Sequence, residues 1–208
     1  MAKILFSPIG GSDPIRNFRD GSMLHICRYY LPDKVILYLT GEMYQHHLQD
    51  NRYVYCLEEL SKKISHPFDI EIITRDELKE VQDYEYFYDD FRTCIGQITS
   101  QMNSEDELFL NVSSGTPAMK NALIILATLA EFSFKPIQVS TPLKRSNYMD
   151  ENVRKYEVEE QWLLDEDNEE NADVTSRCEE VKSLNLIKLL KTNILEKHLM
   201  AYNYPAAY

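Results

Sequence analysis

Short apolar runs alternate with longer amphipathic stretches along most of this chain, and this order constrains its fold more than any other feature. The apolar runs, which we expect to form strands, cover residues 3–7, 34–40, 68–74, 107–111 and 135–141. The stretches that we expect to form helices cover 22–30 and 116–132 and lie within 42–65 and 83–102. Such alternation is typical of βαβ units, in which crossover helices join parallel strands. The sequence therefore predicts an α/β fold, a Rossmann-like, doubly wound, mainly parallel sheet with flanking helices.

The C-terminal part of the chain departs from this pattern. Residues 154–162 alternate between apolar and charged types, so we expect an antiparallel edge strand there. We expect the acidic run that follows to be an exposed turn or linker; it comprises Asp165, Glu166, Asp167, Glu169, Glu170 and Asp173. Residues 183–200 carry leucine and isoleucine at helical spacing, which predicts an amphipathic helix whose apolar face needs a partner. We therefore divide the chain into a domain over 1–164, an acidic linker over 165–182 and the start of a helical region over 183–208, either cut short or belonging to a stand-alone protein.

Composition and charge exclude several classes of protein. The formal net charge of −12 argues against binding to long nucleic acid, because proteins that coat nucleic acid present a basic face. A small anionic ligand is compatible with this charge, since it needs only a few basic residues around one pocket. The four cysteines are widely spaced, so we expect reduced, mostly buried thiols and no metal site. No apolar run approaches the roughly 20 residues of a membrane span and no signal peptide pattern is present, so we expect a cytoplasmic protein without a membrane partner.

Two loops carry residue types that bind phosphate. Loop one, residues 8–15, follows the first predicted strand and reads PIGGSDPI. Its adjacent glycines let the backbone approach a ligand, and its aspartate accepts hydrogen bonds. Arg16 and Arg19 lie just beyond it, where we expect them to meet a phosphate. Loop two, residues 111–117, follows the fourth predicted strand and reads NVSSGTP. It offers hydroxyl groups and free backbone N–H groups at a helix N-terminus, with Lys120 one turn into the helix.

The predicted fold places both loops at one edge. In a doubly wound sheet, ligands bind beyond the carboxyl ends of the strands, where the strand order reverses. Each loop alone also reads as a tight turn with a helix cap, but the two together predict an anion site. Loop two lacks the G-x-x-x-x-G-K-[ST] order of a P-loop, and loop one lacks the G-x-G-x-x-G spacing of dinucleotide enzymes.

Three stretches in this order resemble a known family. They are SPIGGSDPI in the N-terminal region, LHICRYYLPDKVILYLT from Leu24 to Thr40, and NVSSGTPAMK from Asn111. Together they are similar to the CRISPR-associated Rossmann-fold (CARF) sensor domain of type III-A CRISPR ancillary ribonucleases. The resemblance extends over the predicted domain and stops short of the ribonuclease module that full-length relatives carry.

The resemblance implies a homodimer that binds a cyclic oligoadenylate across its two-fold axis and needs no further cofactor. It favours cyclic hexaadenylate over cyclic tetraadenylate. A symmetric ring requires a pocket built from the same loops of two subunits, and its ribose 2′-hydroxyl groups require acceptors such as Asp13 or Asp76. The ligand-binding residues that follow from the resemblance are Ile9, Gly10, Gly11, Ser12, Asp13, Arg16, Thr40, Asp76, Asn111, Ser113, Ser114, Gly115, Thr116 and Lys120.

A second activity is also implied, the slow cleavage of the ring without a metal. A ribose 2′-hydroxyl would attack the adjacent phosphate, and positioning with charge stabilisation is enough for that step. Ser114, Thr116 and Lys120 are the candidate stabilising residues. Arg19 and His25 have the R-x4-6-H spacing of the relatives' ribonuclease motif, but we interpret His25 as a packed residue of the first helix.

Two alternative functions stay open at this point. Another nucleotide-binding regulator, such as a mononucleotide or dinucleotide sensor, would share the fold and the phosphate loops. A non-catalytic interaction scaffold would instead use the 14 tyrosines and the C-terminal amphipathic helix to bind a partner chain.

Overall fold

In the computed structural model, the described residues are 1–208 except 79, 130–133, 142–155, 170–175, 183 and 203–208. Their main element is a six-stranded sheet with the order β5-β4-β1-β6-β7-β8. Five strands are parallel, and only β8 runs antiparallel, beside β7. The strands are β1 (Lys3–Pro8), β4 (Lys34–Thr40), β5 (Asp69–Arg75), β6 (Glu107–Asn111), β7 (Phe134–Val139) and β8 (Cys178–Glu180). The predicted Rossmann-like sheet is thus confirmed, with strand bounds that agree closely with the apolar runs.

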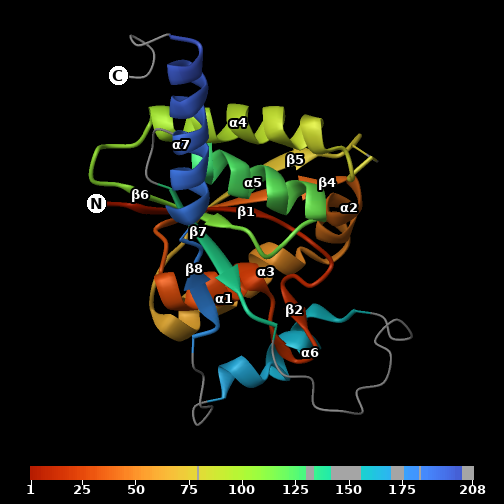
Figure 1. The fold of residues 1–208 in the computed structure, drawn as a ribbon. Helices are drawn as coiled ribbons and strands as arrows, with labels where there is room; N and C mark the ends of the chain where they lie inside the picture. Colours follow the sequence, from red (N-terminus) through yellow and green to blue (C-terminus); the bar gives the residue numbers. More distant parts are fainter. Residues whose placement is uncertain (79, 130–133, 142–155, 170–175, 183, 203–208) are drawn as a thin grey trace.

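Helices cover both faces of the sheet (Figure 1). Below it in this view lie α1 (Ser22–Tyr30) and α3 (Arg52–Ile64), and above it lie α4 (Tyr84–Ser100) and α5 (Pro117–Leu129). Successive residues of a strand point to opposite faces, so Leu5 packs with the α1 and α3 side while Phe6 packs with the α4 and α5 side. Burial of both faces explains why the strands are almost continuously apolar.

The strand order reverses between β1 and β6. The chain moves outward from β1 to β4 and β5, then returns to place β6 on the other side of β1. Ile4 pairs with Leu108 on one side and with Lys34 on the other. Loop one and loop two leave the carboxyl ends of the two strands that flank this reversal, which is where doubly wound folds bind their ligands.

Two predicted elements differ from the structure. The helical stretch within 42–65 is two helices, α2 (Gly41–Asp50) and α3, because Asn51 adopts the left-handed conformation with φ of 52° between them. The edge strand predicted over 154–162 is wrong, since its described part forms the helix α6 (Val158–Leu163), whereas Arg154 lies outside the described residues. Val158 and Trp162 are both buried and lie four residues apart, so they share one face of a helix.

The predicted linker over 165–182 also needs correction. Its described residues include the 3₁₀ helix η2 (Glu166–Asn168) and β8, which adds the antiparallel edge to the sheet. Asp165 and Asp167 are only 2% and 4% exposed, so the acidic run is not a solvated loop at these positions. Glu170 and Asp173 lie outside the described residues.

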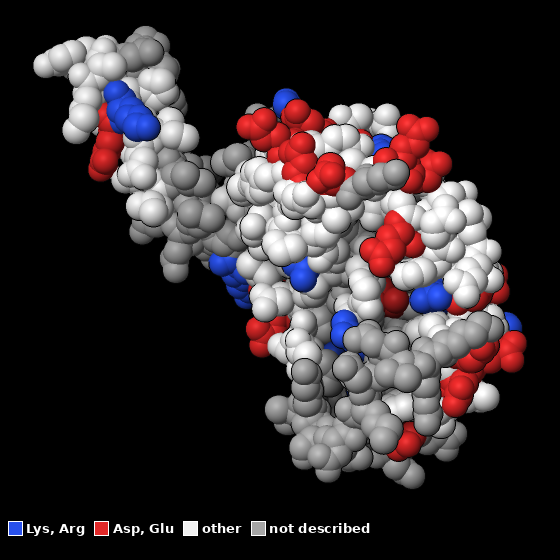
Figure 2. Space-filling model, turned by 90° about the vertical axis from the view of Figure 1, so that its right-hand side faces the viewer, with Lys and Arg blue, Asp and Glu red and all other residues white. Residues whose placement is uncertain are grey.

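The predicted C-terminal helix is present as α7 (Leu184–Met200), and residue 183 lies outside the described residues. Figure 2 shows it projecting from the body of the protein. Apolar side chains along it are exposed, among them Leu189, Ile194, Leu195 and Leu199. Among the described residues, no helix combines the length and the apolar character that crossing a bilayer requires.

The four cysteines are free thiols, as predicted. Cys27, Cys56 and Cys94 are buried, and Cys178 is half-buried. Burial raises the pKa of the Cys56 thiol above its usual range, so these side chains serve as small apolar groups in the core.

Candidate functional site

Loop one and loop two meet at the carboxyl edge of the sheet. A Cβ atom added to Gly10 would lie 2.7 Å from the backbone nitrogen of Gly115, so only glycine lets the two backbones come this close. Gly115 has φ of +82°, which favours glycine for a second reason. These contacts explain why both loops carry glycine, and they place the loops side by side as the sequence predicted.

The buried side chain of Asp13 joins the two loops by hydrogen bonds. Its Oδ2 accepts hydrogen bonds from the Gly10 backbone N–H at 3.2 Å and from the Ser114 hydroxyl, and its Oδ1 accepts from the Met23 backbone N–H at 3.1 Å. Burial raises the pKa of this carboxyl, against the opposing effect of these hydrogen bonds. Asp13 is only 5% exposed, so the expected contact of its carboxylate with a ribose hydroxyl is not available in this conformation. It forms the floor of the site.

Asn111 also lies inside the wall of the site. Its Nδ2 donates to the hydroxyl oxygens of Ser7 and Ser22 at 2.9 and 3.0 Å, and its Oδ1 accepts from the Ser113 backbone N–H at 3.0 Å. The side chain is fully buried and binds β1, α1 and loop two together. Like Asp13, it shapes the loops and does not face a ligand.

The predicted ligand-binding set therefore divides by burial. Ile9, Asp13, Thr40, Asn111 and Ser114 are buried, and among them Asp13, Asn111 and Ser114 hold the loops by hydrogen bonds. The residues that reach the surface, in whole or in part, are Gly10, Gly11, Ser12, Arg16, Asp76, Ser113, Gly115, Thr116 and Lys120. The accessible group supplies backbone N–H groups, a guanidinium and an ammonium, which are donors for phosphate.

The three candidate catalytic residues are not equally placed. The Ser114 hydroxyl donates to Asp13, and the Thr116 hydroxyl donates to the backbone carbonyl of Val81 at 2.7 Å. Neither hydroxyl hydrogen is directed at solvent in this conformation. Lys120 is half-buried in the first turns of α5, so its ammonium is the best placed of the three to neutralise an anion at the loops.

Arg19 was expected to meet a phosphate, and this expectation is wrong. Its guanidinium contacts Glu166 at 2.6 Å and Asp167 at 2.8 Å. Arg19 belongs to a short hairpin of β2 (Ile15–Arg16) and β3 (Arg19–Asp20) that follows loop one, and its guanidinium is held by these two carboxylates. Arg16, on the other strand of this hairpin, is exposed.

A buried network of charges under the hairpin was not predicted. It comprises Arg19, Asp20, His25, Arg28, Asp165, Asp167 and Arg177. Arg28 donates to both carboxylate oxygens of Asp20, at 2.6 and 2.9 Å. Asp20 and Asp167 lie 147 positions apart in the chain, so no local pattern could have indicated that they meet.

The pKa values of two carboxyl groups in this network are shifted in opposite directions. Burial opposes the ionisation of Asp20, but hydrogen bonds from His25 and Arg28 outweigh it and lower its pKa to about 2. Burial and the neighbouring charge of Asp20 raise the pKa of Asp165 to about 9. Oδ2 of Asp165 lacks a donor among the described groups, which fits a protonated oxygen that donates to Asp20.

The network does not have the chemistry of a metal centre. Asp20, His25 and Asp167 offer three ligand atoms within 4.8 Å of one another. However, both ring nitrogens of His25 already have partners: Nε2 accepts from the Arg177 backbone N–H at 3.0 Å, and Nδ1 lies 3.3 Å from Oδ2 of Asp20 and 3.1 Å from the Arg177 guanidinium. The Arg177 guanidinium lies 3.1 Å from both Nδ1 of His25 and Oδ2 of Asp167, so a cationic side chain already stands among the three ligand atoms. We therefore describe these residues as the buried ion network.

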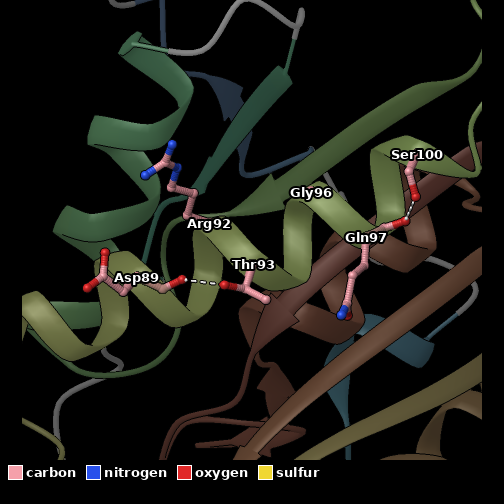
Figure 3. Close-up of a pocket in the computed structure, with 6 residues that line it drawn as sticks. All are labelled: Asp89, Arg92, Thr93, Gly96, Gln97 and Ser100. Carbon is pink, nitrogen blue, oxygen red and sulfur yellow. Dashed lines mark hydrogen bonds between the residues drawn. The ribbon is translucent and has the colours of Figure 1, made fainter.

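A separate hollow of about 490 Å³ lies on the outer surface of α4 (Figure 3). Its lining residues, Asp89, Arg92, Thr93, Gly96, Gln97 and Ser100, all come from this one helix. The hollow on α4 is shallow and is not formed by the loops.

Figure 2 views the protein from the side to which the parallel strands point. Acidic side chains crowd the upper part of this face, and single basic side chains lie nearer its middle.

Comparisons with known proteins agree with this geometry. The Cas_Csm6 CARF domain family matches residues 69–178. The chain is 34% identical over 99% of its length to the CRISPR system endoribonuclease Csm6 of Enterococcus italicus, and 34% identical over 98% of its length to that of Mycobacterium tuberculosis. It covers 47% and 48% of these relatives, so it spans about half of their length.

A solved structure agrees as well. The Enterococcus italicus Csm6 bound to cyclic hexa-2′-fluoro-hexa-dAMP superposes with a TM-score of 0.77 and 32% identity, over 99% of this chain and 48% of that one. The resemblance found in the sequence motifs is thereby confirmed. The chain belongs to the Csm6 CARF domain family.

Proposed function

We propose that this chain is a sensor of type III CRISPR antiviral signalling, which binds a cyclic oligoadenylate at loop one and loop two. The observation that carries the proposal is the close approach of the two loops at the strand reversal, where Gly10 lies against Gly115. The surface of the site presents hydrogen-bond donors to which a phosphate can bind. The carboxylate of Asp13 is buried beneath them and is occupied by hydrogen bonds within the protein. A polyanionic ring of modest size fits such an edge, whereas long nucleic acid does not fit a chain with a net charge of −12.

The ring is proposed to bind across a homodimer. Its phosphates repeat with rotational symmetry, so two identical copies of the loops can each contact one half. Arg16, Asp76 and Lys120, with the backbone of loop one, are the groups that we assign to phosphate and ribose. We propose cyclic hexaadenylate, in preference to cyclic tetraadenylate, as the ligand; the related Csm6 was solved with a six-membered ring analogue.

The output is proposed to lie beyond this chain. The relatives are named endoribonucleases, and this chain corresponds to about half of each. Because η2 packs on the β2–β3 hairpin and β8 pairs with β7 in the main sheet, we extend the sensor domain to about residue 182 and assign α7 to the following helical region. The ring would control the ribonuclease through that region.

We also propose that the protein slowly cleaves the ring that it binds. The 2′-oxygen of one ribose attacks the adjacent phosphorus, the bond from phosphorus to the 5′-oxygen breaks, and a 2′,3′-cyclic phosphate and a 5′-hydroxyl form. The proton leaves the 2′-hydroxyl to solvent and another joins the 5′-oxygen, so no metal is required. Lys120 would stabilise the charge on the phosphorane. Ser114 and Thr116 would assist only after their hydroxyls release Asp13 and Val81.

Thermal unfolding with a series of ligands tests the binding proposal. Cyclic hexaadenylate, cyclic tetraadenylate, linear hexaadenylate and ATP are compared at concentrations about 100 times a micromolar affinity, where binding adds about 2.7 kcal/mol to stability. A rise in Tm with a cyclic ring alone supports the proposal and identifies the ring size. A rise with ATP alone supports a mononucleotide regulator, and no rise with any ligand supports an interaction scaffold.

Two further measurements test the dimer and the cleavage. Sedimentation of the purified protein with and without the ring gives the number of subunits per ring, and one subunit per ring would overturn the symmetric site. For cleavage, excess protein is incubated overnight with the ring, with a 2′-fluoro ring as the matched control, because it lacks the attacking hydroxyl. Loss of the ribose ring alone supports cleavage by 2′-hydroxyl attack, and survival of both rings overturns it.

A further inference from the structure

The β2–β3 hairpin stands between loop one and the C-terminal segment. It begins immediately after loop one, and the Gly21 backbone N–H donates to the Pro14 carbonyl at 2.7 Å to close it. A Cβ atom on Gly21 would lie 2.7 Å from Oδ1 of Asp13, so the base of the hairpin is packed against the floor of the site. A change in the position of Asp13 therefore reaches the hairpin directly.

The opposite side of the hairpin is held by residues 156–168. The Tyr156 hydroxyl donates to the Ile15 carbonyl at 3.3 Å, and the Glu166 backbone N–H donates to the Phe18 carbonyl at 2.9 Å. Asp167 extends this contact to β3. Its Oδ1 accepts from the Arg19 guanidinium at 2.8 Å, and its Oδ2 accepts from the Asp20 backbone N–H at 2.9 Å.

Arg177 continues the path into β8. Its guanidinium donates to Oδ2 of Asp167 and to the Asp20 carbonyl, at 3.1 and 3.0 Å, and also to the Ser140 carbonyl at 3.1 Å. Its backbone N–H donates to Nε2 of His25. β8 begins at the next residue, and α7 follows β8 in the chain. The buried ion network thus joins the hairpin to the strand that precedes α7.

Networks of this kind move as a unit. Separating one buried charge from its partner leaves the other uncompensated, which costs far more than a small displacement of the whole. Hydrogen bonds join Ser114 to Asp13, the hairpin to Asp167, and Asp167 to Arg177. The covalent chain supplies the other two links, from Asp13 through Pro14 into the hairpin and from Arg177 into β8.

We propose that the β2–β3 hairpin and the buried ion network couple the loops of the site to β8 and α7. Asp167 and Arg177 are positioning residues in this coupling. The inference rests on the proposed function only in naming the ligand that would act at the loops. The coupling itself is reciprocal, so it is present in the ligand-free protein and can be measured from either end.

The first experiment therefore uses no ligand. Backbone hydrogen exchange is measured on wild type, on Ser114→Ala, which removes the donor to Asp13, and on Ser100→Ala, an exposed control on α4 whose hydroxyl bonds within its own helix. We expect Ser114→Ala to speed exchange in residues 177–181 by about threefold or more, while β5 on the opposite edge is unchanged. An unchanged rate in 177–181 overturns the coupling.

The second experiment works from the other end. Arg177→Lys keeps the charge and loses the forked contacts, and Asp167→Asn keeps the shape and loses the charge; Asp69→Asn on the exposed start of β5 is the control. Both network variants are expected to speed exchange in residues 10–23, and Asp69→Asn is not. Rates in 10–23 equal to wild type in both folded variants overturn the inference.

Adding cyclic hexaadenylate separates the inference from the proposed function. In wild type the ring is expected to slow exchange in both 10–23 and 177–181. In Arg177→Lys it is expected to bind, by its effect on Tm, yet to leave 177–181 unchanged. If the ring protects residues 177–181 equally in wild type and Arg177→Lys, the coupling is overturned. If the ring binds neither protein, the proposed function is overturned, and the ligand-free exchange rates alone decide the coupling.

Discussion

The Ser114 hydroxyl donates a hydrogen bond to the carboxylate of Asp13, 101 positions earlier in the chain. This contact fixes loop two on loop one at the point where the strand order reverses, and both side chains are buried. The relationship explains why an aspartate in loop one and a serine in loop two lie at the proposed site although both side chains are buried. It also identifies where the site is most sensitive to substitution.

Asp13→Ala should destabilise the fold. It leaves the backbone N–H groups of Gly10 and Met23 and the Ser114 hydroxyl without their acceptor, and buried donors without partners cost about 1–3 kcal/mol each. We expect the free energy of unfolding to fall by about 3 kcal/mol, measured by urea denaturation. Asp76→Ala, at an exposed carboxylate beyond β5, is the control and should change stability by less than about 0.5 kcal/mol. Equal effects of the two substitutions would contradict the role of Asp13 as the floor of the site.

Gly10→Ala and Gly11→Ala should differ sharply, although they are neighbours in loop one. A Cβ on Gly10 would come within 2.7 Å of the Gly115 nitrogen, whereas a Cβ on Gly11 would meet nothing within 4 Å. Gly10→Ala must therefore separate the loops, and we expect ring binding to weaken by about a hundredfold, because two loops lose their alignment. Gly11→Ala should bind within about threefold of wild type. Isothermal titration with the ring measures both, and similar affinities for the two variants would refute the close approach of the loops.

Arg16→Gln should weaken ring binding and reduce its dependence on salt. The side chain is exposed on β2 beside loop one, where its guanidinium can reach a phosphate. Loss of one such charged contact is expected to cost about 1.4 kcal/mol, or about tenfold in affinity. The matched control is Lys62→Gln, at an exposed residue of α3 that is 70% accessible. An affinity and a salt slope equal to those of the control would remove Arg16 from the site.

The buried ion network should make stability fall as the pH rises. Asp165 has its pKa raised to about 9, and in the unfolded chain an aspartate titrates near about 3.9, so between these values the folded protein binds one more proton. The free energy of unfolding then falls by about 1.4 kcal/mol per pH unit from this group alone. Asp20 acts in the opposite sense, and its contribution is lost only as the pH falls towards 2.

Asp165→Asn is the variant that isolates this effect. An amide stays neutral beside Asp20, so we expect the variant to lose less stability than wild type between about pH 5 and pH 8. Urea denaturation at several pH values measures the two curves, with the exposed Asp69→Asn as a control that should run parallel to wild type. Parallel curves for wild type and Asp165→Asn would show that the proton is not held at Asp165.

The pattern of apolar runs by itself determined the parallel sheet, because a strand buried on both faces must be apolar almost throughout. The glycines of loop one and loop two, read with that sheet, determined where the site lies. The tertiary structure alone decided which polar side chains bond to one another when they lie far apart in the chain. Asp13 and Asn111 look like ligand-binding residues in the sequence, yet burial turns their polar atoms inward to other loops.

Contacts between distant segments also explain why the acidic run was misread. Asp165 and Asp167 read as solvated carboxylates, because their partners Asp20, Arg28 and Arg177 are supplied by other segments. The cost of burying a carboxylate depends on charges brought to it by folding, and local sequence does not contain them. Hydrophobic periodicity is a local property and was read directly, whereas charge compensation is a property of the folded chain.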